Sequence, residues 1–167
     1  MRLLAIDPSL RGTGYAVIDS DGRKHSTLEY GVIVNQTKLS QSGCLVAIHE
    51  KITDLIQRHQ PNECAVEGVI FVQSLRTAIT LGAARGASIL AVAQHGIPIY
   101  EYAPRKIKQS VVGSGAADKK QVAFMIRALL GLTETPSADA ADALAIGLTH
   151  IQSQASLKVR KLTGETI

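Results

Sequence analysis

Three segments with the pattern of β-strands open the chain, and no helical period separates them. We expect these strands at residues 2–7, 13–19 and 25–34, with Asp21-Gly22 as a tight turn between the second and the third. Further along, helical periods alternate with short apolar strands at 64–67 and 97–101. An antiparallel meander followed by strand–helix crossovers predicts an α/β fold, in which helices cover a mixed sheet.

Helical periods account for most of the remaining sequence. One runs through residues 45–56, a second covers 75–94, shorter ones are expected at 105–111 and 122–130, and Ser137 is placed to cap a last helix. The second helix is dense in small residues, and Gly82 and Gly86 within it each cost about 1 kcal/mol relative to Ala. We expect close packing at these glycines, either within one chain or across a dimer.

A chain of 167 residues is long enough for one domain with a sizeable core. We expect this domain to cover residues 1–152, and residues 153–167 to form a flexible tail because their periodicity is weak. Cys44 and Cys64 lie in apolar segments without a CxxC spacing, which predicts two reduced, buried thiols. The first residues do not resemble a signal peptide, and no apolar run approaches the ~20 residues of a membrane span, so we expect a cytoplasmic protein.

Basic residues are concentrated in one part of the chain. The formal net charge is +4, but residues 104–127 contain six basic side chains and a single acid, Asp118. A local excess of this kind suits binding to a polyanion such as a nucleic acid. An ordinary solvated helix face is the alternative.

Four carboxylates stand where strands end or where the last helix begins. Asp7 ends the first apolar run and Glu67 ends the fourth strand, so both acids would lie at one edge of the sheet if these strands are neighbours. Asp139 and Asp142 are three residues apart and share one face of the last helix. Singly, such acids are usually turn formers or favourable charges near a helix dipole. Their joint occurrence favours a common site.

Four converging acids would repel one another and raise at least one pKa unless a cation compensates them. Ligands that offer only oxygen favour Mg²⁺ or Mn²⁺ over zinc. Two such ions ~3.5–4 Å apart can hydrolyse a phosphodiester without a protein nucleophile. The sequence offers no obvious Ser-His-Asp or Cys-His set, so it favours metal-assisted hydrolysis at these acids.

Several motifs resemble those of RuvC Holliday-junction resolvases. They are the first strand and loop at 6–15, the acidic segment 65–67, the small-residue run 81–86, the basic loop 108–113 and the acidic helix 139–145. The first motif is shared with other RNase H-like proteins, whereas the basic loop and the acidic helix are specific to the family. The resemblance covers about residues 2–151 and implies an RNase H-like fold, with a five-stranded mixed sheet flanked by helices.

The resemblance also implies an activity, that of a crossover junction endodeoxyribonuclease. Such an enzyme nicks two strands of a four-way DNA junction symmetrically, as a homodimer, in homologous recombination and DNA repair. The catalytic, metal-binding residues would be Asp7, Glu67, Asp139 and Asp142, holding two Mg²⁺ ions for which Mn²⁺ can substitute. We expect DNA contacts from Phe71, Arg76, Arg105, Lys108 and Lys119. The expected protein partners are RuvA and RuvB, which drive branch migration, and no membrane is involved.

The sequence departs from the family pattern beside Glu67. Gly68 stands where better-known members carry a polar residue. The aromatic residue that family members wedge against bases at the branch point sits one place later, at Phe71, with Ile70 before it. A core position is the alternative for Phe71.

Two other classes of function remain as alternatives. Actin-like and sugar-kinase ATPases also open with a strand, an Asp and a Gly-rich hairpin, but they need a second lobe for which 167 residues leave no room. A DNA-binding dimer that has lost cleavage is the other alternative, and the presence of all four acids argues against it.

Overall fold

The chain opens with three strands and then alternates helices with strands, as the sequence pattern predicts. The computed structural model describes residues 1–68, 74–113 and 118–163, with side chains described as far as residue 156. The elements are β1 (Arg2–Asp7), β2 (Gly12–Ser20), β3 (His25–Val34), α1 (Gln41–His59), β4 (Glu63–Glu67), α2 (Leu75–Ala93), β5 (Ile99–Tyr102), α3 (Pro104–Val112), α4 (Lys119–Leu130) and α5 (Ala138–Thr163). The expected elements are confirmed, and only their ends differ.

The strands form one mixed sheet in the order β3-β2-β1-β4-β5. β1 pairs antiparallel with β2 and parallel with β4, and β5 runs parallel to β4. Residues 3–6 of β1 are fully buried. An unbroken aliphatic run suits this place because a central strand that is covered on both faces has no solvent-facing side.

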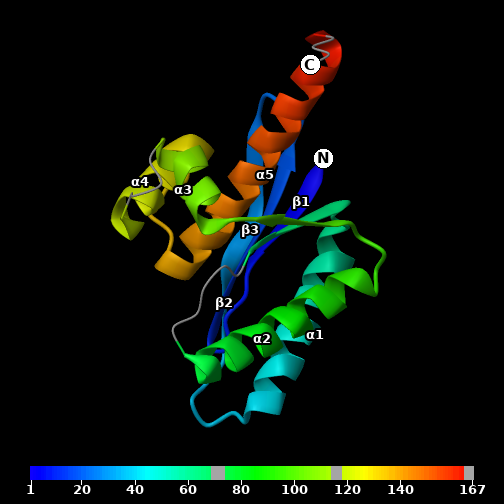
Figure 1. Ribbon diagram of the computed structural model, residues 1–167, viewed down its shortest axis with the longest axis vertical. Helices are drawn as coiled ribbons and strands as arrows, with labels where there is room; N and C mark the ends of the chain where they lie inside the picture. The colour runs from blue at the N-terminus through cyan, green and yellow to red at the C-terminus, as the bar shows by residue number, and fades with distance from the viewer. Residues whose placement is uncertain (69–73, 114–117, 164–167) are drawn as a thin grey trace.

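Helices cover both faces of the sheet (Figure 1). α1 and α2 lie on one face, and α3, α4 and α5 lie on the other. Leu4, Ile6 and Val66 belong to the core beneath α1 and α2, whereas Ala5 and Ala65 belong to the core beneath α5. Because side chains alternate along a strand, this division also fixes the face toward which the residues at the strand ends point.

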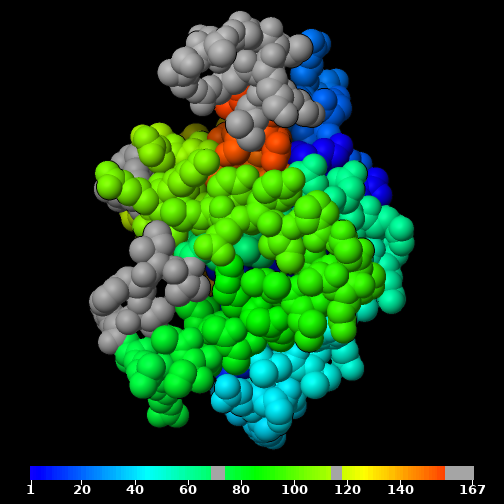
Figure 2. All heavy atoms as spheres, turned by 45° about the vertical axis from the view of Figure 1, so that its right-hand side comes forward, coloured from blue at the N-terminus to red at the C-terminus, as the bar shows by residue number. Residues whose placement is uncertain are grey.

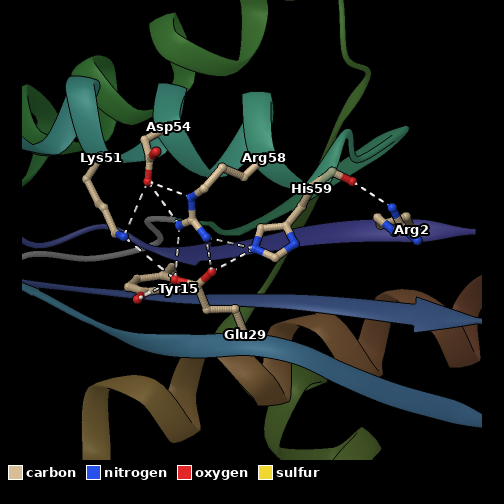
Figure 3. Close-up of polar contacts among 7 residues, drawn as sticks. All are labelled: Arg2, Tyr15, Glu29, Lys51, Asp54, Arg58 and His59. Atoms are coloured by element: carbon tan, nitrogen blue, oxygen red, sulfur yellow. Dashed lines mark hydrogen bonds and ion pairs between the residues drawn. The ribbon is translucent and has the colours of Figure 1, made fainter.

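A network of charged side chains ties α1 to the edge strand β3 (Figure 3). Glu29 accepts a hydrogen bond from Arg58 at 2.7 Å and lies 2.6 Å from His59 Nε2, with Lys51 Nζ at 3.6 Å. Arg58 also pairs with Asp54, four residues earlier on the same helix. The hydrogen bond from Arg58, followed by that from His59, lowers the pKa of Glu29 to about 2. The network is therefore an ionic brace between the helix and the edge of the sheet.

A second polar contact joins α5 to the sheet from within the core. His150 is fully buried, with Nδ1 2.9 Å from the Tyr102 hydroxyl and Nε2 2.6 Å from Glu63 Oε2. Both partners lie on strands β4 and β5, so His150 links the middle of α5 to that half of the sheet.

The two cysteines are buried free thiols, as expected. Burial raises the pKa of Cys64 to about 12, which keeps this thiol protonated and unreactive.

Two helices differ in length or composition from the pattern of the other elements. α5 continues to Thr163, so the backbone of residues 153–163 is helical rather than irregular. Once a helix is nucleated by packing, each further residue adds one hydrogen bond, and this extension needs no apolar period. Among the described helices, α2 is long and apolar enough to cross a membrane by length and composition alone. It contains Arg76 and Arg85 and packs along α1.

Candidate active site

Asp7 and Glu67 end two neighbouring parallel strands and face the same side of the sheet. The pairing of β1 with β4 ends at Ile6↔Val66, so each acid lies one residue beyond the last paired position. Ala5 and Ala65, two residues before the acids, both belong to the core beneath α5. Because side chains alternate, Asp7 and Glu67 also face α5.

Asp139 and Asp142 come to this place from the first turns of α5. The Ala141 N–H donates to the Ser137 carbonyl at 2.8 Å, so the helical hydrogen bonds begin just before Asp139. Residues three apart in a helix share a face. Both acids therefore project from the end of α5 that lies beside the ends of β1 and β4.

Two glycines on β2 allow α5 to come this close to the sheet. Gly14 is the residue paired with Asp7, and a Cβ atom built on it would lie 2.1 Å from the Asp139 carbonyl oxygen. A Cβ atom on Gly12 would lie 2.9 Å from Asp139 Oδ2. A side chain at Gly14 would therefore push the helix away, and its absence lets the backbone of Asp139 lie next to β2.

The charges of neighbouring acids act on Asp7 and on Glu67. Burial, followed by the charges of Glu67, Asp142 and Asp139, raises the pKa of Asp7 to about 7, against a smaller opposing effect of Lys119. Burial and then Asp142 raise the pKa of Glu67, and Lys119 and Lys108 oppose this shift. Coupling of this kind acts between groups that are neighbours in space. The structure thus brings together the four acids that were singled out from the sequence.

The chemistry of this group fits a divalent cation. All the donors are carboxylate oxygens, and a cation would remove the repulsion that raises the pKa of Asp7. Within the described part of the chain, however, no three Asp, Glu, His or Cys side chains converge closely enough to form a ready ligand set. Lys119 Nζ donates to Asp142 Oδ2 at 3.0 Å and neutralises part of the charge. The acids are therefore neighbours, but among the described residues they do not form the ready ligand set that a common metal site would need.

Basic side chains border the acids from α3 and α4. Lys119, at the start of α4, pairs with Asp142, and Lys108 of α3 lies near enough to lower the pKa of Glu67. Arg105 is exposed in the first turn of α3. Two lysines of the basic stretch that the sequence predicts, Lys108 and Lys119, therefore adjoin the acids.

Arg76 lies apart from these lysines, near the start of α2. It lines a groove of about 520 Å³ together with Ser9, Leu10 and Arg11, which follow closely after Asp7 in the chain. The groove lies between the loop after β1 and the starts of α1 and α2, since Gln41 and Thr77 also line it. Phe71, which was expected to contact DNA, lies outside the described residues, as does Ile70.

Sequence reasoning missed two features of the site. Gly12 and Gly14, two residues apart in an otherwise regular strand, are a usable signal, because such glycines often mark a close approach of another backbone. Arg85 donates to the backbone carbonyl of Glu67 at 2.6 Å. No sequence signal could have identified this contact, because it joins a helical side chain to a backbone atom of a strand 18 residues away.

Comparisons with known proteins identify the family of this chain. The family model described as crossover junction endodeoxyribonuclease RuvC matches residues 3–150. The protein of that name from Akkermansia muciniphila is 55% identical over 162 residues, which cover 97% of each chain. The one from Saccharophagus degradans is 46% identical over 155 residues, which cover 93% of this chain and 90% of the relative.

The fold is also similar to that of a solved structure from this family. The structure of T. thermophilus RuvC in complex with a Holliday junction substrate superposes with a TM-score of 0.87 at 34% identity, over 93% of this chain and 96% of that one. The five-stranded mixed sheet with its flanking helices is the RNase H-like fold of these resolvases, which confirms the expected fold class. The family match and the high identity extend over nearly the whole chain. The chain therefore belongs to the crossover junction endodeoxyribonuclease RuvC family.

Proposed function

We propose that this protein is a metal-dependent endonuclease that resolves four-way DNA junctions by paired nicks, in homologous recombination and DNA repair. The observation that carries the proposal is the meeting of Glu67, Asp139 and Asp142 around Asp7, where the sheet adjoins α5, so closely that after burial their charges raise the pKa of Asp7. A solved relative in the same family is described as bound to a Holliday junction substrate. Membership of a nuclease family argues against the ATPase alternative.

The four acids would hold two Mg²⁺ ions, with Mn²⁺ as a substitute, because all their donor atoms are oxygens. Bound there, the ions supply an activated water and stabilise the departing oxygen of the phosphodiester. Asp7 and Glu67 offer ligands from the rigid sheet, and Asp139 and Asp142 offer them from the helix. Because the pKa of Asp7 is about 7, a proton competes with the cation for this carboxylate near neutral pH.

The basic residues would hold the DNA backbone over the acids. Lys108 and Lys119 lie close enough to influence the acids and would contact phosphates next to the bond that is cut. Arg105 on α3 and Arg76 in the groove beside residues 9–11 would contact the arms. Phe71 would wedge against bases at the branch point.

We infer a homodimer from the exposed face of α2. Leu75, Ile79 and Leu90 are 78%, 60% and 53% exposed, which is unusual for large apolar side chains on one helix. Gly82, Gly86 and Ala93 lie on the same helical face and are exposed too. Figure 2 shows residues of α2, in green, at the surface of the molecule. We call this set of six residues the α2 stripe.

The glycines of the α2 stripe support the dimer over packing within one chain. Nothing in the described part of the chain lies within 4 Å of a Cβ atom built on Gly82 or Gly86. The destabilisation of the helix by these glycines is therefore not offset by a close contact inside the described part of this chain. The same helix of a second copy would find room there for close backbone approach, and two copies would bring one set of acids to each of two DNA strands. A site of action in the cytoplasm, beside RuvA and RuvB, is proposed from the family resemblance alone.

The test is cleavage of a synthetic four-way junction compared with a linear duplex of the same sequence, with Mg²⁺ and with EDTA. We expect paired nicks in the junction only, and only with Mg²⁺. Asp7→Asn is expected to abolish cutting while junction binding stays close to wild type, because Asp7 binds metal and not phosphate. Tight junction binding without any cutting by the wild type would favour the DNA-binding alternative instead.

A further inference from the structure

A mostly buried arginine holds the end of β4 from the side of the sheet opposite to the acids. Arg85 Nη1 donates to the backbone carbonyl of Glu67 at 2.6 Å, and Nη2 pairs with the carboxylate of Glu101. The Arg85 side chain is only 17% exposed. Hydrogen bonds from a charged donor that is shielded from water are stronger than those made at the surface.

The face from which Arg85 arrives determines what it can touch. Val66, the residue before Glu67, belongs to the core beneath α1 and α2, so the Glu67 side chain points the other way, toward α5. From α2, only the backbone of Glu67 is within reach. Arg85 therefore fixes the main chain that carries the acid and leaves the carboxylate free to bind on the other face.

The backbone of Glu67 needs a partner from outside the sheet. The pairing of β1 with β4 ends at Ile6↔Val66, one residue earlier. Pro8, which follows Asp7, has no N–H with which to extend that ladder. On the other side, the Gly68 N–H donates to the Tyr102 carbonyl at 2.8 Å, which ties β4 to β5. Arg85 thus supports the last residue of the strand where the pairing with β1 has stopped.

Glu101 orients the arginine, and Gly68 leaves room for Glu101. Glu101 pairs with Val66 across β4 and β5, so its side chain lies on the same face as α2. A Cβ atom built on Gly68 would lie 2.7 Å from Glu101 Oε1 and 3.1 Å from its Cγ. The carboxylate of Glu101 therefore packs directly over Gly68, where any larger residue would displace it.

We propose that Arg85 is a positioning residue for the catalytic acid Glu67, oriented by the Glu101 carboxylate that packs over Gly68. The proposal rests on the proposed function, since it assigns to Arg85 the task of holding one wall of the metal-binding site. Its consequence is specific: without Arg85 the Glu67 carboxylate is less well placed, and more metal is needed to assemble the site. Loss of a group that holds a metal ligand in place typically costs 10–100-fold in metal affinity or activity.

An ion pair that only stabilised the fold would change the melting temperature without changing the metal requirement. Glu101 is 58% exposed, and pairs between solvent-exposed charges contribute little to folding stability. The brace of Arg58 with Glu29 and Asp54 provides a matched control, because it also joins one arginine to two acceptors, here two carboxylates in place of a carboxylate and a backbone carbonyl. It lies away from the acids: Glu29 pairs with Val17, and Val17 with Leu4, three residues before Asp7 and two strands away.

The experiment measures the metal requirement in two independent ways. Thermal unfolding of the full chain is followed as Mg²⁺ or Mn²⁺ is titrated, which gives an apparent binding midpoint without any cleavage. Single-turnover cutting of a four-way junction is then measured over the same metal concentrations, together with junction binding in EDTA. The variants are Arg85→Met, which keeps the aliphatic stem but cannot donate, Arg85→Lys, Glu101→Gln and Arg58→Met.

We expect Arg85→Met to raise both metal midpoints by about tenfold, with junction binding in EDTA unchanged. Arg85→Lys and Glu101→Gln should shift the midpoints in the same direction by less, because each keeps a donor near the Glu67 carbonyl. Arg58→Met should lower the melting temperature and leave both midpoints at the wild-type value. If Arg85→Met fails to fold, the two milder variants decide the question.

Midpoints for the Arg85 and Glu101 variants within about twofold of wild type would overturn the proposal, as would an equal shift in Arg58→Met. The unfolding titration separates this outcome from a failure of the proposed function. A wild-type protein that binds metal but does not cut junctions would contradict the nuclease assignment, while the comparison of binding midpoints would still decide the role of Arg85.

Discussion

The backbone of Asp139 lies against Gly14, so closely that a Cβ atom on Gly14 would come within 2.1 Å of the Asp139 carbonyl oxygen. Gly14 is also the residue that pairs with Asp7 on the neighbouring strand. The separation of a helix acid from a strand acid is therefore set by a contact between two backbones, and not by the fit of flexible side chains.

Gly14→Ala is expected to damage cleavage more than folding. Moving α5 to make room for the methyl group would cost about 1–3 kcal/mol in the free energy of unfolding, as other overpacking does. A shift of the acids by about 1 Å can lower the rate of cutting by roughly 100-fold. Gly43→Ala in α1 is the control, because the atoms nearest to its methyl group would be side-chain atoms of Leu39 and Ser40 and not the backbone of another element. Wild-type cutting by Gly14→Ala would show that this contact does not set the geometry of the site.

The charge of Asp7 should make the metal-free protein less stable as the pH rises. Its pKa is about 7 in the folded protein and 3.8 in an ordinary environment, so between these values the folded state holds the proton that the unfolded state has lost. The free energy of unfolding then falls as the pH rises through this window. Asp7→Asn has no such group to titrate. In EDTA, the melting temperature of this variant minus that of the wild type should therefore increase from about pH 4 to about pH 7. Parallel curves for the two proteins would contradict the raised pKa of Asp7.

Lys108→Ala should weaken junction binding and make it less sensitive to salt. If Lys108 contacts one phosphate, the slope of log K against log salt should fall in magnitude by about 0.9. The measurement is a titration of junction binding in EDTA at several salt concentrations. Lys24→Ala, in the exposed hairpin between β2 and β3, is the matched control and should leave the slope unchanged. An unaltered slope in Lys108→Ala would remove this lysine from the interface.

Ile79→Glu should convert the proposed dimer into monomers. Ile79 is 60% exposed within the α2 stripe, and two glutamates facing each other across a dimer would have to be desolvated. Light scattering coupled to size-exclusion chromatography reports the mass directly. Val46→Glu is the control, since Val46 is 55% exposed but lies on α1, outside the stripe. If Val46→Glu were a monomer while Ile79→Glu remained a dimer, the interface would not lie at the α2 stripe.

The ion pairs of Glu29 should stabilise the fold at every pH at which the Glu29 carboxylate is charged in the unfolded chain too. Its pKa is lowered to about 2, so its contribution is fully present above the ordinary value of 4.5 and is lost as the pH falls through about 2. Because Arg58 is partly exposed, we expect Glu29→Gln to lower the free energy of unfolding by only about 1 kcal/mol at neutral pH. The difference from the wild type should shrink between about pH 4.5 and about pH 2 in urea titrations. A difference that is independent of pH would mean that the ion pairs contribute nothing.

The sequence by itself determined the elements and the chemistry of this protein. Unbroken aliphatic runs that stop at Asp7 and Glu67 define both strands and leave an acid at each end, which is a local pattern. The spacing of Asp139 and Asp142 puts them on one helical face for the same local reason. The basic stretch of residues 104–127 was also readable, because charge density depends on composition alone.

Only the tertiary structure decided how these parts meet. It placed β1 in the centre next to β4, so that Asp7 and Glu67 became neighbours. It pressed α5 onto Gly14, brought Arg85 to the carbonyl of Glu67 from the opposite face, and left the α2 stripe exposed. Such contacts join residues far apart in the chain and depend on how whole layers pack. A periodic pattern records which side of an element is apolar, but not which backbone or side chain will lie against it.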